Sequence, residues 1–360
     1  MVFFYEMMWK FGVLAGNGCI YCIPFDSVRR NILKIDTNSS TVTVLDVEFP
    51  EAGKLLWTSG ALGLDGCIYC MPLKARFMLK MNPEDDTVSS VGIDFGEDFN
   101  KFSGTVAGND GCLYGIPDQE MDIMKFDPVN QVQAMVAVVG KPNDNIFMCR
   151  NGGALGRDSC IYAIEERYGK ILKINVVNDT YSFVGNKVQT ERGCLWGRPL
   201  LGNDGCIYFP PFRASHALRF DPEIQVATLV GGDFGKNGEK WEGGAVASDG
   251  VIYCIPSGAD HVLSIDPFKD FAIATQASME QFPEDLGRLF DMNEYWYGKT
   301  VYDCAITKFG KDKVHQVIDE CIPLNVEFAG NNIPSFMVAG SCRNTSVFVI
   351  FHLLRKNLDF

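Results

Sequence analysis

Five large aromatic residues and one arginine recur at the same position relative to a tight turn. Each stands nine residues before a turn glycine or, for the arginine, before Ser159; the six are Trp9, Trp57, Phe102, Arg150, Trp196 and Trp241. Aromatic rings gathered in one place could stack against a glycan or another flat ligand. The alternative is structural, because large rings also fill the space between neighbouring units of a repeat. The sequence leaves both interpretations open.

Two short cysteine motifs, Cys19-Ile-Tyr-Cys22 and Cys67-Ile-Tyr-Cys70, resemble metal-ligand or redox pairs. Both lie in segments with strand character, where residues three apart point to opposite faces and stand roughly 10 Å apart. Such a pair can neither chelate one zinc ion nor close a disulfide without breaking the strand. The recurrent Asp-Gly pairs lack the Asp-x-Asp-x-Asp spacing of a calcium loop. We therefore predict no metal site and no cofactor.

Motifs of the common catalytic sites are missing from the sequence. It contains no Gly-x-Ser-x-Gly elbow, no phosphate-cradling glycine loop and no His-Glu-x-x-His pair. A central metal site of the lactonase type would need Asp, Glu, Asn or His at the positions that tryptophans occupy here. We predict no catalytic residue and favour a non-catalytic protein over an enzyme.

The elements that would position these residues form a repeat. Aligned on one tyrosine, the copies are centred on Tyr21, Tyr69, Tyr114, Tyr162, Tyr208 and Tyr253, with steps of 48, 45, 48, 46 and 45 residues. Each copy holds four short segments of strand character, which in the first copy are 9–15, 19–23, 32–36 and 41–45. An Asn-Gly or Asp-Gly pair joins the first two segments in every copy except the fourth, which has Asp158-Ser159. Such a pair between apolar runs predicts a hairpin because both residues accept a positive φ.

A second landmark closes the third segment of each copy. There an Asp or Asn follows an apolar residue and in four copies precedes proline, as in Phe126-Asp127-Pro128. This pair ends a strand and starts a turn, after which a fourth strand follows. Four antiparallel strands in six copies, with no helix between them, predict a mainly β fold, a six-bladed β-propeller over residues 1–278. Because the first strand of a blade lies at the central axis, the aromatic residues and Arg150 would ring the mouth of the channel.

The fourth copy departs most from the repeat. It carries Arg150 for the aromatic residue, Ser159 for the turn glycine, and Glu165-Glu166-Arg167 where other copies carry proline. A unit that breaks several structural rules at once is a candidate for function, although sequence drift explains the same facts. We predict that Arg150, Glu165, Glu166 and Arg167 form a ligand-binding surface, together with the aromatic residues around the channel.

The blade resembles repeats of the NHL and virginiamycin-lyase-like propellers. The resemblance rests on a Gly-Gly pair before the inner strand, the Asp-Gly-x-Ile-Tyr-x-Ile-Pro hairpin and the Ile-Asp-Pro third strand, over residues 9–276. The sequence looks still closer to uncharacterised propeller proteins of diatoms and related algae, and it is a weaker match to kelch repeats. These motifs imply the fold rather than an activity. The lyases of that superfamily depend on His and Glu at the channel mouth, and His216 and His261 lack a matching motif, so lyase activity is not expected.

The last 80 or so residues, 279–360, follow a different pattern. Helix-like periodicity replaces alternation, with short helices predicted over 300–310 and 312–321, the first ending at a glycine. Ala305 and Ala339 stand 34 residues apart, which is close to the ankyrin period. The tail resembles a degenerate ankyrin-like helix pair. Two such units are too few to stand alone, so we expect a small α-helical region that packs on the propeller or on a partner.

The net charge limits the classes of binding partner, and the placement of the cysteines indicates the redox state of the compartment. The formal net charge is −13, which disfavours nucleic acid and anionic membrane surfaces as partners and leaves basic partners open. No run of the sequence reaches the roughly 18 apolar residues of a membrane span. Most of the 13 cysteines lie in apolar strand segments, which is typical of reduced, buried thiols. We therefore expect a soluble protein in a reducing, cytoplasmic environment.

Two functions follow from these observations. The first is a non-catalytic scaffold that binds a protein or peptide partner, a basic one included, on the face where variable loops converge. The alternative is an enzyme or a binder of a small, glycan-like ligand that uses an aromatic-ringed central channel. The sequence does not set the identity of the ligand, the oligomeric state or the way in which the ring closes.

Overall fold

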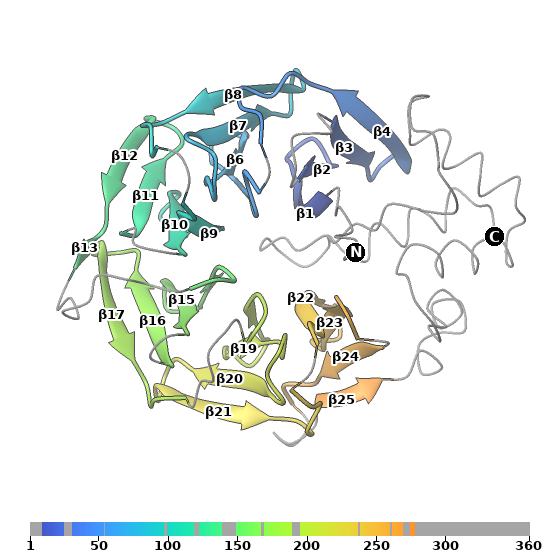
Figure 1. The fold of residues 1–360 in the computed structure, drawn as a ribbon, viewed down its shortest axis with the longest axis vertical. Coiled ribbons are helices and arrows are strands. Elements are labelled where there is room, and N and C mark those ends of the chain that lie inside the picture. The colour runs from blue at the N-terminus through green and yellow to red at the C-terminus, as the bar shows by residue number, and fades with distance from the viewer. Residues whose placement is uncertain are drawn as a thin grey trace, which may run out of the picture.

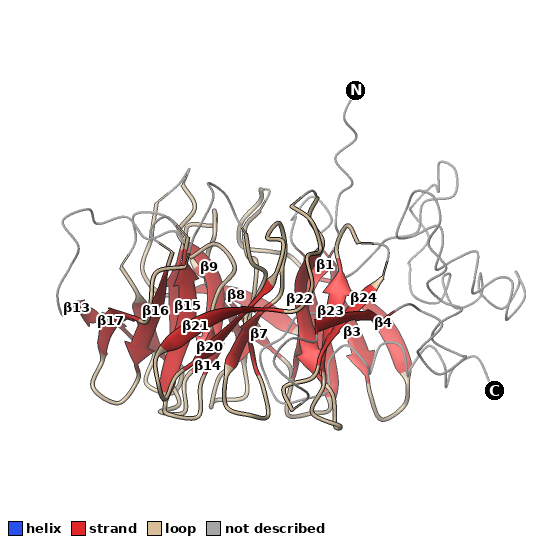
Figure 2. Ribbon diagram, turned by 90° about the horizontal axis from the view of Figure 1, so that it is seen from below, coloured by secondary structure: helices blue, strands red, loops and turns tan. Residues whose placement is uncertain are grey.

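A computed structural model shows six β-sheets arranged around a central axis (Figure 1). It describes residues 9–24, 31–53, 55–96, 99–118, 122–138, 149–166, 169–188, 195–236, 238–259, 261–268 and 274–277. Seen from the side, the sheets form a disc whose strands run between its two faces (Figure 2). The prediction of a six-bladed β-propeller with four antiparallel strands per blade is confirmed. The predicted helical tail lies outside the described residues.

The strands of the first three blades follow one another from the axis outward. The first blade has β1 (Trp9–Leu14), β2 (Cys19–Pro24), β3 (Asn31–Asp36) and β4 (Thr41–Asp46). The second has β5 (Ala61–Leu62), β6 (Ile68–Cys70), β7 (Met78–Asn82) and β8 (Thr87–Val91). The third has β9 (Phe102–Ala107), β10 (Leu113–Pro117), β11 (Met124–Asp127) and β12 (Val132–Met135).

The remaining blades repeat this order with one addition. The fourth blade has β14 (Ala154–Leu155), β15 (Cys160–Glu165), β16 (Lys170–Asn175) and β17 (Thr180–Val184). The fifth has β18 (Leu200–Leu201), β19 (Ile207–Phe209), β20 (Ala217–Asp221) and β21 (Val226–Val230). The sixth has β22 (Trp241–Val246), β23 (Ile252–Pro256), β24 (Val262–Ile265) and β25 (Ala274–Ala277). The addition is β13 (Ala137–Val138), which pairs in parallel with the outer edge of β17 and satisfies part of that open edge.

The first hairpin turn of each blade depends on a positive φ. The turn glycines have φ values of 79° to 89°, and Ser159 in the fourth blade adopts φ 61°. The departure from Asp-Gly in the fourth copy therefore changes the residue and keeps the turn. Ser159 Oγ also lies 2.5 Å from the amide nitrogen of Asn109, which donates a hydrogen bond to it from the preceding blade.

The turn aspartate is the centre of a polar motif that recurs from the second to the fifth blade. Its Oδ2 atom accepts a hydrogen bond from the tyrosine four residues later: Tyr69 to Asp65 (2.8 Å), Tyr114 to Asp110 (2.9 Å), Tyr162 to Asp158 (2.7 Å) and Tyr208 to Asp204 (2.9 Å). A cation of the third strand forms an ion pair with the same carboxylate, as Lys125 does with Asp110 at 2.9 Å. Burial alone would raise the pKa of Asp110, but hydrogen bonds from Lys125 and Tyr114 hold that pKa below its usual value.

This motif also connects neighbouring blades. The turn between the third and fourth strands of the next blade reaches back to it, with Lys125 Nζ 2.5 Å from the Asp179 carboxylate and Gln131 donating to the Tyr69 hydroxyl at 2.9 Å. In the first blade Tyr21 donates to Asp86 at 2.9 Å. The recurrent tyrosine is thus a joint between blades as well as a part of its own hairpin.

Five apolar clusters hold the blades together, and each contains residues of two consecutive blades. Together they join the first blade to the second and so on through the sixth. Within the described residues no such cluster joins the sixth blade to the first. Tyr253 in the sixth blade is accordingly half-buried, whereas the tyrosines at this position in the other five blades are at most 2% exposed.

We expect Tyr114→Phe to destabilise the protein by about 0.5–1.5 kcal/mol, because it removes the hydrogen bond from a buried tyrosine to the partly exposed Asp110 carboxylate and leaves the ring in place. Urea denaturation of the full chain, followed by circular dichroism, measures this. The matched control is Tyr253→Phe, whose hydroxyl stands 3.5 Å from Asp249 in a more exposed setting. An equal loss in both variants would contradict a role for the joint between blades.

Candidate functional site

The aromatic residues at the starts of the inner strands are buried. Trp57, Phe102, Trp196 and Trp241 are at most 2% exposed. Three indole N–H groups donate to carbonyl oxygens twenty residues further on: Trp57 to Phe77 (3.3 Å), Trp196 to His216 (3.0 Å) and Trp241 to His261 (2.9 Å). Phe102 packs edge-on against Phe95 with centroids 5.4 Å apart. The three indoles lie beside the loop of their own blade, and none of the four buried rings presents an open face to a ligand. Trp9 opens β1, and its side chain is outside the described part.

The strand register shows at which face of the disc these aromatic residues lie. Each aromatic residue pairs with a proline at the end of the second strand or two residues beyond it: Trp9 with Pro24, Trp57 with Pro72, Phe102 with Pro117, Trp196 with Pro211 and Trp241 with Pro256. The inner strands therefore begin at the face where the connections between second and third strands lie. We call this the loop face. The opposite face carries the regular turns with the Tyr-Asp motif.

Arg150 lies at the loop face beside a group of buried carboxyl groups. We define the acidic corner as Asp118, Cys149, Arg150, Glu165 and Glu166. Glu165 is fully buried, Glu166 is 5% and Asp118 6% exposed, and Arg150 is half-buried. Burial and the charges of the Glu165, Glu166 and Asp118 carboxylates raise the pKa of the Cys149 thiol, so all three acids lie within electrostatic range of that sulfur. The structure thus brings together three of the four charged residues that the fourth copy predicts, and Arg167 lies outside the described residues.

The carboxyl group of Asp118 is buried, and hydrogen bonds satisfy it only in part. Burial raises its pKa, while a hydrogen bond from Asn100 and the charge of Arg150 act in the opposite direction. Its Oδ1 atom is buried and accepts no hydrogen bond. A buried carboxylate oxygen without a donor is costly, which makes this atom a natural place for an incoming cation or N–H group.

Glu166 has a structural task that the sequence did not reveal. In the second and fifth blades, a backbone carbonyl after the second strand accepts a hydrogen bond from the residue that precedes the first strand of the next blade. Leu73 O accepts from Lys101 N at 2.9 Å, and Phe212 O accepts from Lys240 N at 2.7 Å. At the same place in the fourth blade the Glu166 carboxylate accepts from Leu195 N at 3.2 Å. The side chain therefore replaces a backbone contact between blades, and this accounts for part of the irregularity of the fourth copy.

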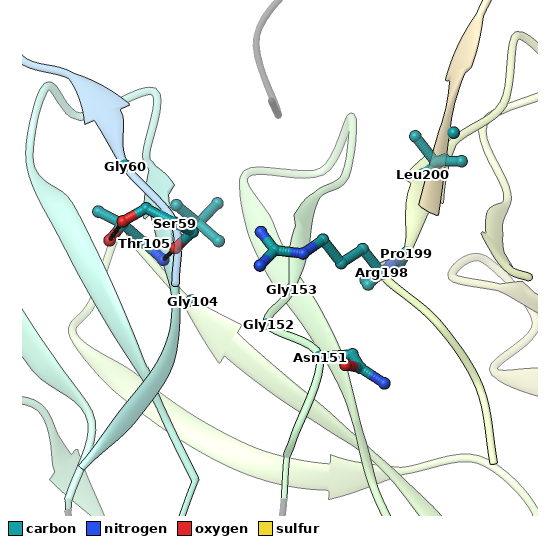
Figure 3. Close-up of a pocket in the computed structure, with 12 residues that line it drawn as sticks. Ser59, Gly60, Gly104, Thr105, Asn151, Gly152, Gly153, Arg198, Pro199 and Leu200 are labelled. Carbon is teal, nitrogen blue, oxygen red and sulfur yellow. Dashed lines mark hydrogen bonds between the residues drawn. The ribbon is translucent and has the colours of Figure 1, made fainter. Parts of the chain in front are cut away.

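A pocket lies in the central channel, just inside the loop face (Figure 3). Its empty volume, including the open mouth, is about 460 Å³. The inner strands of five blades line it, with Ser59, Thr105, Asn151 and Arg198 as polar residues and Gly104 and Gly152 among several glycines. The guanidinium of Arg198 crosses the channel from the fifth blade, and Nη2 donates to the Thr58 carbonyl of the second blade at 2.5 Å.

Sequence reasoning missed Arg198 and Asp118, although both had a signal. Arg198 stands two residues after Trp196, where other copies carry Ser59, Gly104 or Gly152. Asp118 takes the position that Glu166 has in the next copy. In an alignment of the six copies, each of these residues is a charged residue at a position where most other copies carry a small or apolar one. This signal can be used only once the position is known to face the channel axis or the acidic corner.

Two further observations concern metals and membranes. In the part of the chain that the structure describes, no three His, Cys, Asp or Glu side chains gather as a metal ion would require. None of the described residues forms a helix with the length and apolar character needed to cross a bilayer.

Comparison with known proteins identifies the fold. No family model matches the sequence, and no curated protein does. Among solved structures, a streptogramin B lyase is similar with a TM-score of 0.55 and 13% identity, over 77% of this chain and 87% of that one. A catalytically inactive virginiamycin B lyase from Staphylococcus aureus with quinupristin has a TM-score of 0.53 and 13% identity, over 71% and 79%. Hydrazine synthase of Kuenenia stuttgartiensis has a TM-score of 0.54 and 13% identity, over 74% and 78%.

At this identity the similarity concerns the fold alone. Lyases and a hydrazine synthase share it, so the fold carries no single activity. The resemblance of the blade to virginiamycin-lyase-like repeats is supported, while the closer resemblance to algal propeller proteins and the ankyrin-like tail remain predictions. The chain is therefore a six-bladed β-propeller whose fold is similar to that of the streptogramin B and virginiamycin B lyases.

Proposed function

We propose that the protein is a non-catalytic scaffold whose loop face binds a protein or peptide partner at the acidic corner. The observation that carries this proposal is the Oδ1 atom of Asp118, which is buried without a hydrogen bond beside two further carboxylates. A lysine, arginine or amino terminus of a partner would supply the missing donor and offset the charge. Arg150, the half-buried cation of the corner, would border the bound segment.

The two faces of the disc differ in a way that supports the same surface. On the turn face, the carboxylates of Asp65, Asp110, Asp158 and Asp204 already have cations of their own blade. At the acidic corner the described residues contribute three acids and one arginine. With a net charge of −13 for the whole chain, a basic partner is attracted over a distance and retained at this point.

A glycan-like ligand in an aromatic-ringed channel has less support. Stacking needs an accessible ring face, and the four described rings are buried between loops and blades. Glu165 is fully buried, and the Glu166 carboxylate already accepts a hydrogen bond from Leu195 N. Within the corner, the proposal therefore assigns the contact with a partner to Asp118 and Arg150.

The test compares the proteins recovered on immobilised full-length variants by quantitative mass spectrometry. Asp118→Asn keeps the shape and removes the charge, Arg150→Ala removes the neighbouring cation, and Arg157→Ala is the control because Arg157 is exposed on the opposite face. We expect at least one protein that wild type and Arg157→Ala retain equally and that Asp118→Asn recovers about tenfold less, as loss of one partner of a buried charge pair predicts. An identical set of proteins on wild type, Asp118→Asn and Arg150→Ala would remove the assignment.

A further inference from the structure

The charge of Arg198 in the channel has no ion-pair partner among the described residues. The nearest carboxylate to influence it is that of Glu242, which acts on Arg198 through its charge without a close ion pair. Burial lowers the pKa of the guanidinium, and Glu242 opposes this shift in part. Of its three nitrogen atoms, Nη2 donates to the Thr58 carbonyl. Nε and Nη1 have no hydrogen-bond acceptor in the described chain and border the pocket.

A hydroxyl group faces this guanidinium from the other side of the pocket (Figure 3). Ser59 Oγ accepts a hydrogen bond from Thr105 N at 2.6 Å. Among the described residues no acceptor is found for the hydrogen of this hydroxyl, and Ser59 is one of the residues that line the pocket. The Arg198 guanidinium of the fifth blade and the Ser59 hydroxyl of the second blade therefore both offer hydrogen-bond donors to the channel pocket.

We propose that this pocket binds a single carboxylate group, held by the Arg198 guanidinium and the Ser59 hydroxyl. A planar guanidinium matches the two oxygens of a carboxylate, and the pairing is stronger in a site with little water. The glycines of the wall, such as Gly104 and Gly152, leave room beside the guanidinium where side chains would otherwise fill the channel. The ligand is either a small organic acid or the terminal carboxylate of a peptide that enters from the loop face.

The experiment is calorimetric titration of the full chain at neutral pH and constant ionic strength. The probes are acetate, inorganic phosphate, and one short peptide prepared with a free and with an amidated carboxyl terminus. We expect saturable binding of acetate or of the free-acid peptide, and weaker binding of phosphate. Binding of acetate identifies a small acid as sufficient, and binding of the free-acid peptide alone identifies the peptide terminus as the source.

Substitutions then assign the binding to the pocket. Arg198→Gln should weaken it at least about tenfold, Arg198→Lys less, because one ammonium replaces a two-pronged donor, and Ser59→Ala severalfold. Arg157→Gln is the matched control, since Arg157 also donates to a carbonyl, that of Asn203 at 2.6 Å, but on the opposite face. If Arg198→Gln does not fold by circular dichroism, Ser59→Ala and Arg198→Lys decide.

Three results would overturn the proposal: no saturable binding of either carboxylate probe to the wild type, unchanged affinity in the Arg198 and Ser59 variants, or tighter binding of phosphate than of acetate. The proposal is independent of the acidic corner. Asp118→Asn should leave the carboxylate titration unchanged, so failure of one assignment is distinguishable from failure of the other.

Discussion

Trp241→Ala is expected to lower the free energy of unfolding by about 3–5 kcal/mol, the range for removal of a large buried aromatic side chain. Trp241 is 1% exposed and belongs to the apolar cluster between the fifth and sixth blades. Its indole packs edge-on against Phe234 and His261, each with centroids 5.3 Å away. Alanine would leave a cavity at this junction and also remove the donor to the His261 carbonyl.

The measurement is the urea midpoint of the full chain by circular dichroism, with Phe268→Ala as the control. Phe268 is an aromatic residue of the same blade but is 67% exposed, so its removal should change the stability by no more than about 0.5 kcal/mol. A loss below about 1 kcal/mol for Trp241→Ala would mean that the site collapses around the cavity. It would reopen the view that these rings serve a ligand rather than the packing of the blades.

Gly104→Ala should also be strongly destabilising, by about 1–3 kcal/mol or more, because the added methyl group has nowhere to go. A Cβ at Gly104 would stand 2.6 Å from the Cα of Gly152, which is backbone of the next blade. Backbone cannot move aside as a flexible side chain can, so the inner strands of the third and fourth blades would be forced apart. The same shift would distort the wall of the carboxylate pocket.

Gly16→Ala is the matched control for this substitution. A Cβ at Gly16 meets no atom within 4 Å, and the residue is not among those with positive φ. Its replacement should therefore leave the stability within about 0.5 kcal/mol, which is usual for surface positions. Equal urea midpoints for the two alanine variants would contradict close contact between neighbouring inner strands.

The two proposed binding places have different relations to the repeat. The acidic corner combines Asp118 and Glu166, which occupy equivalent positions in consecutive copies and both act on the Cys149 thiol through their charges. The channel pocket arises because Arg198 is long enough to reach the second blade from the fifth. The acidic corner is formed by residues of two consecutive blades, whereas the channel pocket depends on a contact between blades on opposite sides of the axis.

The sequence by itself determined the blade. Alternating apolar residues and the Asp-Gly and Asp-Pro turns predict four strands and their order, and the first blade departs from the predicted bounds 9–15, 19–23, 32–36 and 41–45 by only one residue at some ends. These signals are local, because side-chain alternation and turn chemistry depend on residues close together in the chain. Even the exception at Ser159 keeps its turn, since one serine can adopt the positive φ that glycine adopts readily.

Only the tertiary structure decided which part of the molecule the recurrent aromatic residues face. The repeat period located Trp57, Phe102, Trp196 and Trp241. Whether each ring points into the channel or packs between strands and loops depends on how neighbouring blades pack against one another. In the same way, Thr58 and Arg198 are 140 residues apart and meet only because the ring of blades places them across the axis. Contacts of this kind depend on the angle between sheets, to which residues from the whole chain contribute and which no single stretch of sequence specifies.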